Sequence, residues 1–281
     1  VRWLAPTILA GNVGLLKHAS LTQGCAALIQ QLVQAAGAPD GLFQNLPVKS
    51  DQVARIIADP RVAGVTLTGS EGAGAQVAQA AGKALKKVVL ELGGSDPFIV
   101  MYDAFLTRFT AAMAAMKVGD PLADGTEIGP LSSVEQRDTV LEQLARAKAD
   151  GATLTGGEKI ERAGAWMAPG VLTGVDPDAG FAREEIFGPV AMLFRADDID
   201  AAIALANDVP FGLGSSVWTR DQAEIDRFVR DIEAGMVAVN QMLASIPEAP
   251  FGGVKRSGHG RELGPWGLHE FMNLKAVMIG G

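Results

Sequence analysis

Apolar runs and amphipathic segments alternate through the first hundred residues. The runs NVGLLK (12–17) and VAGVTLTGS (62–70) are short and largely apolar, which favours strands buried on both faces of a sheet. Residues 20–37 and 71–87 instead carry apolar side chains at helical spacing, and Gly37 follows the first of these segments as a stop signal. This alternation predicts an α/β fold with a mostly parallel sheet covered by helices on both faces.

Further elements continue the same order. The additional elements expected here are strands at 41–48, 88–92 and 97–101 and a helix at 50–59. Ser20 or Thr22 is the expected N-cap of the helix at 20–37, and Ser50 is the expected N-cap of the helix that follows it.

The first seventeen residues, VRWLAPTILAGNVGLLK, form one apolar run. Pro6, Gly11 and Asn12 interrupt the run and Lys17 ends it, so it is too short to cross a bilayer as a helix. We expect a strand buried on both sheet faces here in preference to a signal peptide. The chain does not begin with Met, and we expect it to be a piece of something longer.

A second alternating region begins after residue 101. Its expected helices are 132–151, 197–208 and 221–235, and its expected strands are 152–157, 170–175, 188–196, 212–219 and 236–241. The end of the chain differs, because a Gly-rich loop (249–264) precedes a final apolar strand (268–279). This tail is expected to return elsewhere in the fold or to join a partner subunit.

The junction between the two regions is unusual. In LELGGSDPFIVMYDAFLTRFTAAM (90–113), a strand pattern runs directly into a helix on which Phe105 and Phe109 share a face. No Gly, Pro, Asn or Asp separates them at Met101–Tyr102, although strands and helices are normally joined by a turn. We place a domain boundary at this junction.

Composition and charge narrow the class of protein. The 281 residues are 48% apolar, which is enough for one large or two modest domains. The net charge is −8 with no basic stripe, so nucleic acid and anionic membranes are poor candidate partners. A single cysteine excludes an intrachain disulfide framework and suits a reducing compartment, so we expect a cytoplasmic protein.

The stretch VTLTGSEGAG is a candidate phosphate site. A strand runs into Gly69–Ser70 and then into a helix that contains Gly74. The unpaired N–H groups of a helix N-terminus suit a phosphate, and glycines let a ligand approach the main chain. The spacing is not G-x-G-x-x-G, and an ordinary Ser-capped helix behind a tight turn explains the same residues equally well.

Two charged residues, Lys17 and Glu91, lie at or within predicted strands, where a ligand-binding or catalytic role is possible. Lys17 follows a predicted strand, at the sheet edge where open α/β folds bind ligands, although a solvated surface lysine is an equal alternative. Glu91 lies in an apolar strand, where burial would make it a candidate general base, but it could equally face water at the strand end. Glu184 and Glu185 form a carboxylate pair for which surface charge is the default explanation.

The remaining nucleophile and metal-ligand candidates are weak. Cys25 lies on a helix among apolar neighbours, which favours a buried structural cysteine over a nucleophile. The histidines, His18, His259 and His269, show no metal-ligand spacing with it, and no metal is expected.

Taken together, eight segments resemble the NAD(P)-dependent aldehyde dehydrogenase superfamily. Within it, they most resemble the succinate-semialdehyde-dehydrogenase-like branch. They are AGNVGLLKHAS, VTLTGSEGAG, LELGGSDPFIV, VGDPLADGTEIGPL, REEIFGPVAMLF, NDVPFGLGSSVWTRD, EAGMVAVNQ and PFGGVKRSGHGRELG, in family order over nearly the whole chain. The resemblance implies a Rossmann-type parallel-sheet cofactor domain (1–101), incomplete at its N-terminus. It also implies an α/β catalytic domain (102–245) and a Gly-rich loop with an oligomerisation strand (246–281).

The resemblance also implies roles for the cofactor-site residues. Lys17 looks like the lysine that holds the adenine ribose. Ser20 stands where NAD-preferring members often carry Glu, so NADP is expected to be tolerated or preferred, with NAD as the alternative cofactor. The remaining cofactor-site residues are Gly69, Ser70 and Gly74 in the pyrophosphate turn, Glu185 on the nicotinamide ribose and Phe187 beside the nicotinamide.

On the substrate side, Glu91 resembles the family's general base and Phe251 an aromatic residue of the aldehyde pocket. In the family, a cysteine thiolate attacks the aldehyde, hydride leaves for the nicotinamide, and the glutamate activates a water that releases the acid. A long segment carrying that cysteine separates DPFIV from YDAFLxRF in the family, and here it is absent at Met101–Tyr102. The oxyanion-hole asparagine falls just upstream of Val1, and Cys25 is no substitute for the nucleophile.

The expected function is therefore an oxidoreductase of this family that oxidises an aldehyde, in one reading a semialdehyde, to the acid with NAD(P)+. The chain as written lacks the nucleophile and is expected to be inactive or incomplete. The alternative is a truly shortened protein that acts as a non-catalytic dinucleotide-binding or subunit-interaction module. The expected partners are a small aldehyde and further copies of the chain, as a homodimer or homotetramer.

Overall fold

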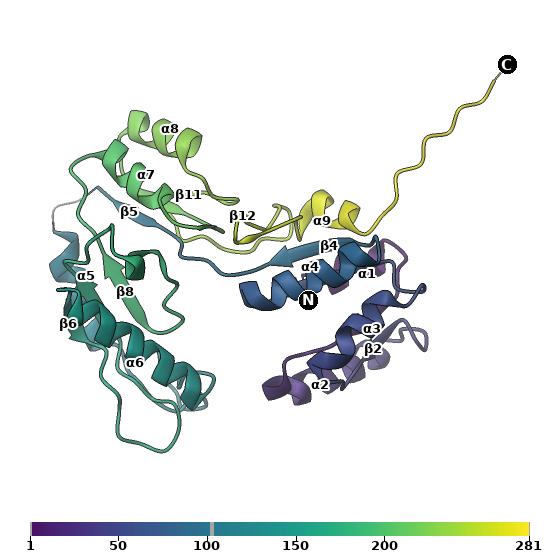
Figure 1. Ribbon diagram of the computed structural model, residues 1–281, viewed down its shortest axis with the longest axis horizontal. Coiled ribbons are helices and arrows are strands. Elements are labelled where there is room, and N and C mark those ends of the chain that lie inside the picture. Colours follow the sequence, from purple (N-terminus) through teal and green to yellow (C-terminus); the bar gives the residue numbers. More distant parts are fainter. Residues whose placement is uncertain (1, 102–103, 281) are drawn as a thin grey trace. The chain divides into compact units, whose positions relative to one another are not determined.

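The computed structural model describes residues 2–101 and 104–280 (Figure 1). The chain forms two compact units, which are described separately below. The first comprises Val1–Gly93, Ala234–Met236 and Leu243–Gly281, and the second comprises Gly94–Glu233 and Val237–Met242. The division falls at Gly93–Gly94, before the boundary expected at Met101–Tyr102, and the C-terminal segment belongs to the first unit. Tyr102 lies outside the described residues, so the expectations about that junction stay predictions.

The first unit is an α/β structure. Its elements are α1 (Leu4–Leu9), β1 (Gly14–Leu16), α2 (Gln23–Ala35), β2 (Phe43–Asn45), α3 (Val53–Ala58), β3 (Gly64–Thr68), α4 (Glu71–Lys83), β4 (Lys87–Glu91), β12 (Val254–Lys255), β13 (Gly258–His259) and α9 (Gly264–Glu270). Strands β1 and β2 pair in parallel, and so do β3 and β4. β13 returns antiparallel to β4 with Gly258 opposite Glu91, and α4 lies beside β4 (Figure 1). The predicted parallel α/β class is confirmed.

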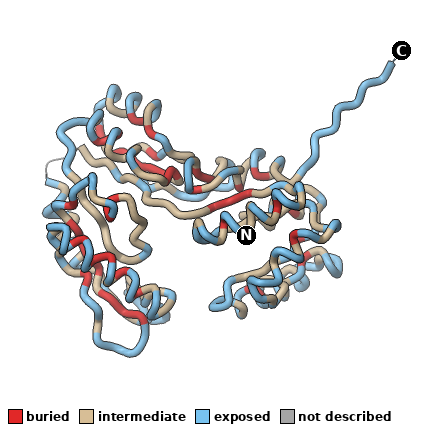
Figure 2. The backbone as a smooth tube through the Cα atoms, viewed as in Figure 1, coloured by how far each residue is buried: buried red, intermediate tan, exposed pale blue. Residues whose placement is uncertain are grey.

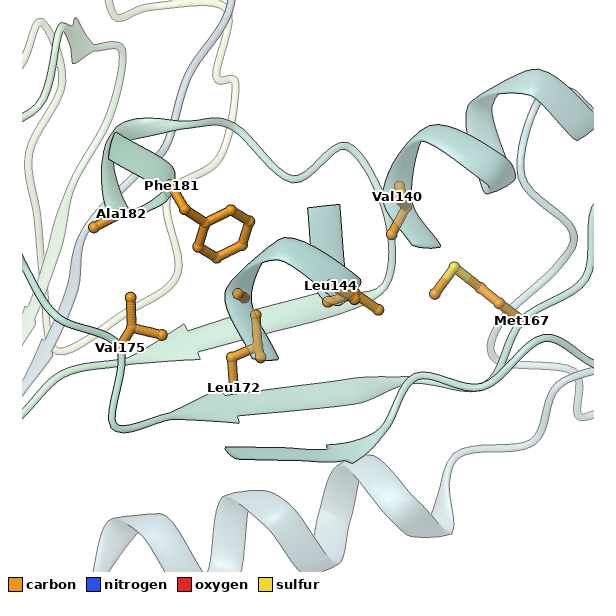
Figure 3. Close-up of a cluster of buried hydrophobic side chains, with 8 residues drawn as sticks. Val140, Leu144, Met167, Leu172, Val175, Phe181 and Ala182 are labelled. Atoms are coloured by element: carbon orange, nitrogen blue, oxygen red, sulfur yellow. The ribbon is translucent and has the colours of Figure 1, made fainter. Parts of the chain in front are cut away.

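The second unit holds two three-stranded sheets, β11-β10-β5 and β6-β7-β8. Its elements are β5 (Phe98–Val100), α5 (Phe105–Ala115), α6 (Val134–Ala149), β6 (Thr153–Gly156), β7 (Gly170–Thr173), β8 (Val190–Leu193), α7 (Ile199–Asn207), β9 (Phe211–Gly212), β10 (Ser216–Trp218), α8 (Gln222–Asp231) and β11 (Ala238–Val239). Val140, Leu144 and Ala147 recur on one face of α6 at helical spacing and are buried against β7. Figure 3 shows Leu144 and Phe181 gathered with Leu172 in this core.

Helix starts follow the cap residues in some places and not in others. Ser133, Asp198 and Asp221 cap α6, α7 and α8, since each side chain accepts a hydrogen bond from a main-chain N–H of the first turn. Thr22, the alternative to Ser20, occupies the N-cap position of α2, although its side chain accepts no capping hydrogen bond. Ser20 and Ser50 each begin a 3₁₀ turn that precedes the helix, so the prediction is wrong for these two serines.

Three other expectations are corrected. The apolar start contains helix α1 before β1, because Leu4–Leu9 form a turn of helix whose Thr7 hydroxyl donates to the Trp3 carbonyl at 2.6 Å. Residues 272–280 have no regular structure and are largely exposed, so the final strand is wrong for the chain by itself (Figure 2). A strand needs a neighbouring edge for its hydrogen bonds, and this segment has none within the chain that is described. Cys25 is exposed on α2 and is no core residue.

Among the helices described, none is long and apolar enough to pass through a membrane.

Candidate functional site

The turn between β3 and α4 is a strand–turn–helix connection, as the sequence predicted. The Gly69 N–H donates to the Glu91 carbonyl at 3.0 Å, which fixes the turn to β4. Ser70 is the N-cap of α4, and its hydroxyl accepts from the Ala73 N–H at 3.3 Å. The N–H groups of Glu71 and Gly72 precede the first intrahelical bonds, so they point outward from the helix start. This geometry suits an anion, and it also satisfies the simpler explanation of a Ser-capped helix.

Gly74 and Gly72 have different environments in this turn. A Cβ on Gly74 would lie 2.6 Å from Leu92 Cδ2, so the glycine is needed for α4 to pack closely on the segment after β4. A Cβ on Gly72 would meet no atom within 4 Å. Close helix packing at one glycine and open space at the other are compatible with a phosphate approaching this turn.

Lys17 and Ser20 follow β1, one connection earlier in the chain. Lys17 is half-buried directly after the strand, and Ser20 is exposed at the start of its 3₁₀ turn. Both therefore follow the carboxyl end of a parallel strand, as Ser70 does after β3. Their union with Ser70 in one cofactor site stays a prediction, because β1–β2 and β3–β4 form separate hydrogen-bonded sheets.

Glu91 is buried, which excludes the alternative of a strand-end glutamate facing water. Its exposed fraction is 3%, and neither carboxylate oxygen has a hydrogen-bond partner among the residues described. Burial, followed by the negative charge of Glu262, raises the pKa of Glu91 to about 8, while Arg2 and Arg261 act in the opposite direction. A carboxyl group without donors and with a pKa near neutrality is suited to proton transfer.

The Gly-rich loop covers Glu91. Gly252 adopts a φ of +151°, and a Cβ there would lie 2.7 Å from Glu91 Oε1. Beside Gly252, the Phe251 and Glu262 main chains exchange two hydrogen bonds of 2.7 Å. Phe251, the predicted pocket aromatic, is thus next to a glycine at which a side chain would collide with Glu91.

Two residues of this site escaped the sequence analysis. Glu262 is buried, and its carboxylate accepts a 2.7 Å hydrogen bond from Arg2 Nε. The Arg2 guanidinium also lies 4.0 Å from the centroid of the Phe251 ring. No local pattern signals a contact between residues so far apart in the chain. The only sign was that Glu262 is an acidic residue in a loop otherwise rich in glycine and cations.

Glu185 and Phe187 belong to the second unit, whereas Glu91 and Phe251 belong to the first. Gln143 Nε2 donates to the Glu185 carbonyl at 3.1 Å, and Gln136 Nε2 donates to the Phe187 carbonyl at 3.0 Å. The main chain is therefore anchored to α6, while the Phe187 side chain is 67% exposed. The roles of Glu185 and Phe187 toward a nicotinamide stay predictions.

Cys25 is the only cysteine in the sequence, so no other thiol can serve as a nucleophile beside Glu91. Within residues 2–101 and 104–280, His, Cys, Asp and Glu form no group of three that could hold a metal ion.

Known proteins resemble this chain in sequence and in structure. The succinate-semialdehyde dehydrogenase [NADP(+)] 1 of Mycobacterium tuberculosis (strain ATCC 25618 / H37Rv) is 46% identical, and the match covers 99% of this chain and 69% of that protein. The succinic semialdehyde dehydrogenase of Streptococcus pyogenes, solved with NADP+ as the cofactor, is 36% identical with a TM-score of 0.95, covering 100% of this chain and 70% of the other. The structure of Gox0499, solved for its cofactor and substrate selection, is 41% identical with a TM-score of 0.96, covering 99% and 69%.

The matches also locate an internal difference. The alignment to the Mycobacterium tuberculosis protein runs over 316 positions, which exceeds the 281 residues of this chain, so part of it faces residues that this chain lacks. The match to the aldehyde dehydrogenase family comes in two stretches, residues 1–104 and 101–277, which meet at the junction that lacks a turn. Because these two stretches together span nearly every residue, the chain belongs to the aldehyde dehydrogenase family.

Proposed function

We propose that this chain carries the dinucleotide-binding and general-base parts of an NADP-linked semialdehyde dehydrogenase, and that by itself it binds NADP(H) without oxidising aldehydes. The buried, partnerless Glu91 carboxyl group carries this proposal, because it is costly for folding and useful for proton transfer. The relatives named for succinate semialdehyde and NADP(+) support the choice of substrate and cofactor.

The turn at the start of α4 fits the diphosphate of such a cofactor. The outward N–H groups of Glu71 and Gly72 donate to phosphate oxygens, and the open side of Gly72 admits them. Lys17 binds the adenine ribose, and Ser20 leaves room for a 2′-phosphate without repelling it. Glu185 binds the other ribose and Phe187 packs near the nicotinamide.

The chain's own residues prepare the hydrolytic half of the reaction. A bound nicotinamide would supply the hydride acceptor for the oxidation. In the hydrolytic half, Glu91 takes a proton from water, for which it must first be ionised. Because its pKa is raised to about 8, this step is favoured at alkaline pH. The acyl group to be hydrolysed requires a cysteine other than Cys25, which is exposed on α2.

A second function is favoured by the C-terminal segment. Leu274, Met278 and Ile279 are each more than 90% exposed in a segment without regular structure. An apolar segment of this kind gains stability by pairing with another subunit. In this alternative the chain is a dinucleotide-binding or subunit-interaction module, and it forms a cytoplasmic homodimer or homotetramer in either case.

Two measurements test the primary function. Intact mass should be 29.2 kDa if the chain is complete as written. At that mass, NADPH fluorescence titration should show saturable binding, while succinate semialdehyde with NADP+ should give no NADPH. Turnover by protein of this mass would contradict the proposal, as would the absence of NADPH binding.

The cofactor assignment has a matched test. Ser20→Glu should weaken NADP(H) binding about tenfold and leave NAD(H) binding nearly unchanged, because a carboxylate repels the 2′-phosphate. Ser50→Glu is the control, since Ser50 begins the equivalent 3₁₀ turn before α3. Equal effects of the two substitutions would remove Ser20 from the site.

A further inference from the structure

The outer face of α2 carries a row of exposed apolar side chains. Cys25, Leu28 and Leu32 recur at helical spacing, which places them on one side of the helix. Leu28 and Leu32 are 52% and 60% exposed, and Cys25 is exposed as well. Leu21, which is 73% exposed, lies in the 3₁₀ turn just before the helix. We call these four residues the α2 stripe.

The opposite side of α2 already has a partner within the first unit. Ala26 is fully buried, and Gln30 Oε1 accepts a 2.7 Å hydrogen bond from the Asn45 N–H of β2. The helix is therefore fixed on β2 by its inner face, and the α2 stripe is what remains outside. Apolar side chains that are grouped on a surface, unlike scattered ones, indicate a contact surface.

The spacing of the α2 stripe is complementary to itself. Its members follow one another at steps of four, three and four residues, which are the steps of a heptad seam between two helices. This order of steps reads the same in both directions along the chain. Two antiparallel copies related by a two-fold axis would therefore bring Cys25 opposite the partner's Leu28. The same axis would bring Leu21 opposite the partner's Leu32, so that every member of the stripe meets an apolar side chain.

The distribution of charge favours the same arrangement. No charged residue lies between His18 and Asp40, although the protein carries a net charge of −8. Two copies of the chain therefore repel each other less where α2 meets α2 than where charged surfaces meet. A Cβ on Gly24 would meet no atom within 4 Å, so the surface beside Cys25 is open to a closely approaching helix.

We propose that the α2 stripe is an interface between two copies of this chain, which pair their α2 helices in antiparallel orientation about a two-fold axis. This contact is separate from the C-terminal segment. It involves neither Glu91 nor the turn before α4, so the proposed function can fail without affecting it.

Disulfide formation between two differently placed thiols tests the register. The parent, whose only thiol is Cys25, is mixed with Cys25→Ser/Leu28→Cys, whose only thiol is at position 28. Air oxidation at micromolar concentration should give mainly the mixed dimer, identified by intact mass, because facing positions lie within the roughly 4.4–6.8 Å between Cα atoms that a disulfide allows. Each protein alone should give about fivefold less dimer, since identical positions are offset along antiparallel helices.

Two further variants separate a specific contact from random collision. Leu32→Glu, added to the Cys25→Ser/Leu28→Cys chain, should lower the yield of mixed dimer about tenfold or more, because it removes a leucine from the seam and adds a charge. Leu122→Glu in the same chain is the matched control, because Leu122 is 94% exposed in the second unit, and the yield should be unchanged. Circular dichroism checks that each variant is folded.

The proposal is overturned if the parent alone forms a disulfide dimer as readily as the mixture does, since that indicates parallel or random pairing. Absence of the mixed dimer, or equal yields with Leu32→Glu and Leu122→Glu, would also overturn it. If Leu32→Glu does not fold, Cys25→Ser/Gln34→Cys decides, because Gln34 is exposed on α2 away from the stripe. Equal yields of mixed dimer from thiols at positions 28 and 34 would contradict the proposal.

Discussion

Glu91 and Glu184 are two glutamates with opposite environments. Glu91 is buried without a hydrogen-bond donor, and its pKa is raised to about 8 by that burial and by Glu262. Glu184 receives two 2.7 Å hydrogen bonds from Arg146 and one of 3.1 Å from Gln143, and the arginine bonds hold its pKa below the ordinary value. The satisfied carboxylate contributes to structure, whereas the unsatisfied one costs stability. A buried carboxyl group without hydrogen-bond donors is therefore a stronger indication of a catalytic role than a carboxylate that is fully paired.

The largest effect should come from filling the space over Glu91. Gly252→Ala places a Cβ 2.7 Å from Glu91 Oε1 and 2.9 Å from the Gly260 carbonyl, at a φ of +151° that alanine rarely adopts. The free energy of unfolding should fall by about 3–5 kcal/mol in urea denaturation. Gly82→Ala in α4, where a Cβ meets nothing within 4 Å, should be neutral or stabilising by up to about 1 kcal/mol. Similar losses in both variants would show that the cover over Glu91 is not tight.

The second effect concerns the charge of Glu91. Because its pKa in the folded protein is raised from 4.5 to about 8, the folded protein keeps a proton that the unfolded chain loses between these values. The free energy of unfolding therefore falls as pH rises across this window and then levels off. Glu91→Gln should remove that fall and gain roughly 2–4 kcal/mol relative to the parent at pH 9. A parallel pH dependence in parent and variant would mean that Glu91 is ionised at little cost.

The smallest effect is expected at Glu184, and it has the opposite sign. The pKa of Glu184 is lowered in the folded protein. Its ionised carboxylate therefore stabilises the fold at pH values above the ordinary pKa near 4.5, and this stabilisation is lost as pH falls through the folded-state pKa. Glu184→Gln should cost about 0.5 kcal/mol at pH 7 and less at pH 3, because the pair with Arg146 is partly exposed. Thermal unfolding at the two pH values measures it. A loss of several kcal/mol would place Glu184 with Glu91 as an energetically critical carboxylate.

Local signals predicted much of the fold. Helix α6 was predictable because Ser133, the apolar spacing and Gly151 all lie within or beside the helix. The start of the chain was misread because a continuous apolar run fits a short helix as well as a strand. The exposure of Cys25 was missed because Leu28 and Leu32, which are also exposed, make α2 look like a core helix.

The candidate site was predictable only in part. Glu91 stood out because a charge interrupts an apolar strand, and Gly69, Ser70 and Gly74 because they follow one. Arg2 and Glu262 gave no comparable signal, because they belong to the site only through their contact with each other, and 260 positions separate them in the sequence. Contacts of that range are set by the packing of β13 and the Gly-rich loop on β4, which no local pattern encodes.

The pairing of Gly258 with Glu91 has a consequence for the order of events during synthesis. The first unit contains both the start and the end of the chain, so it cannot be completed while the middle is still being made. At about 5–20 residues per second, β4 leaves the ribosome roughly ten to thirty seconds before the strand that covers it. During that interval Glu91 remains hydrated, and its carboxyl group titrates as in a peptide. The carboxyl group of Glu91 is therefore not desolvated until the C-terminal segment packs on β4. Burial of Glu91 is thus a late step of folding.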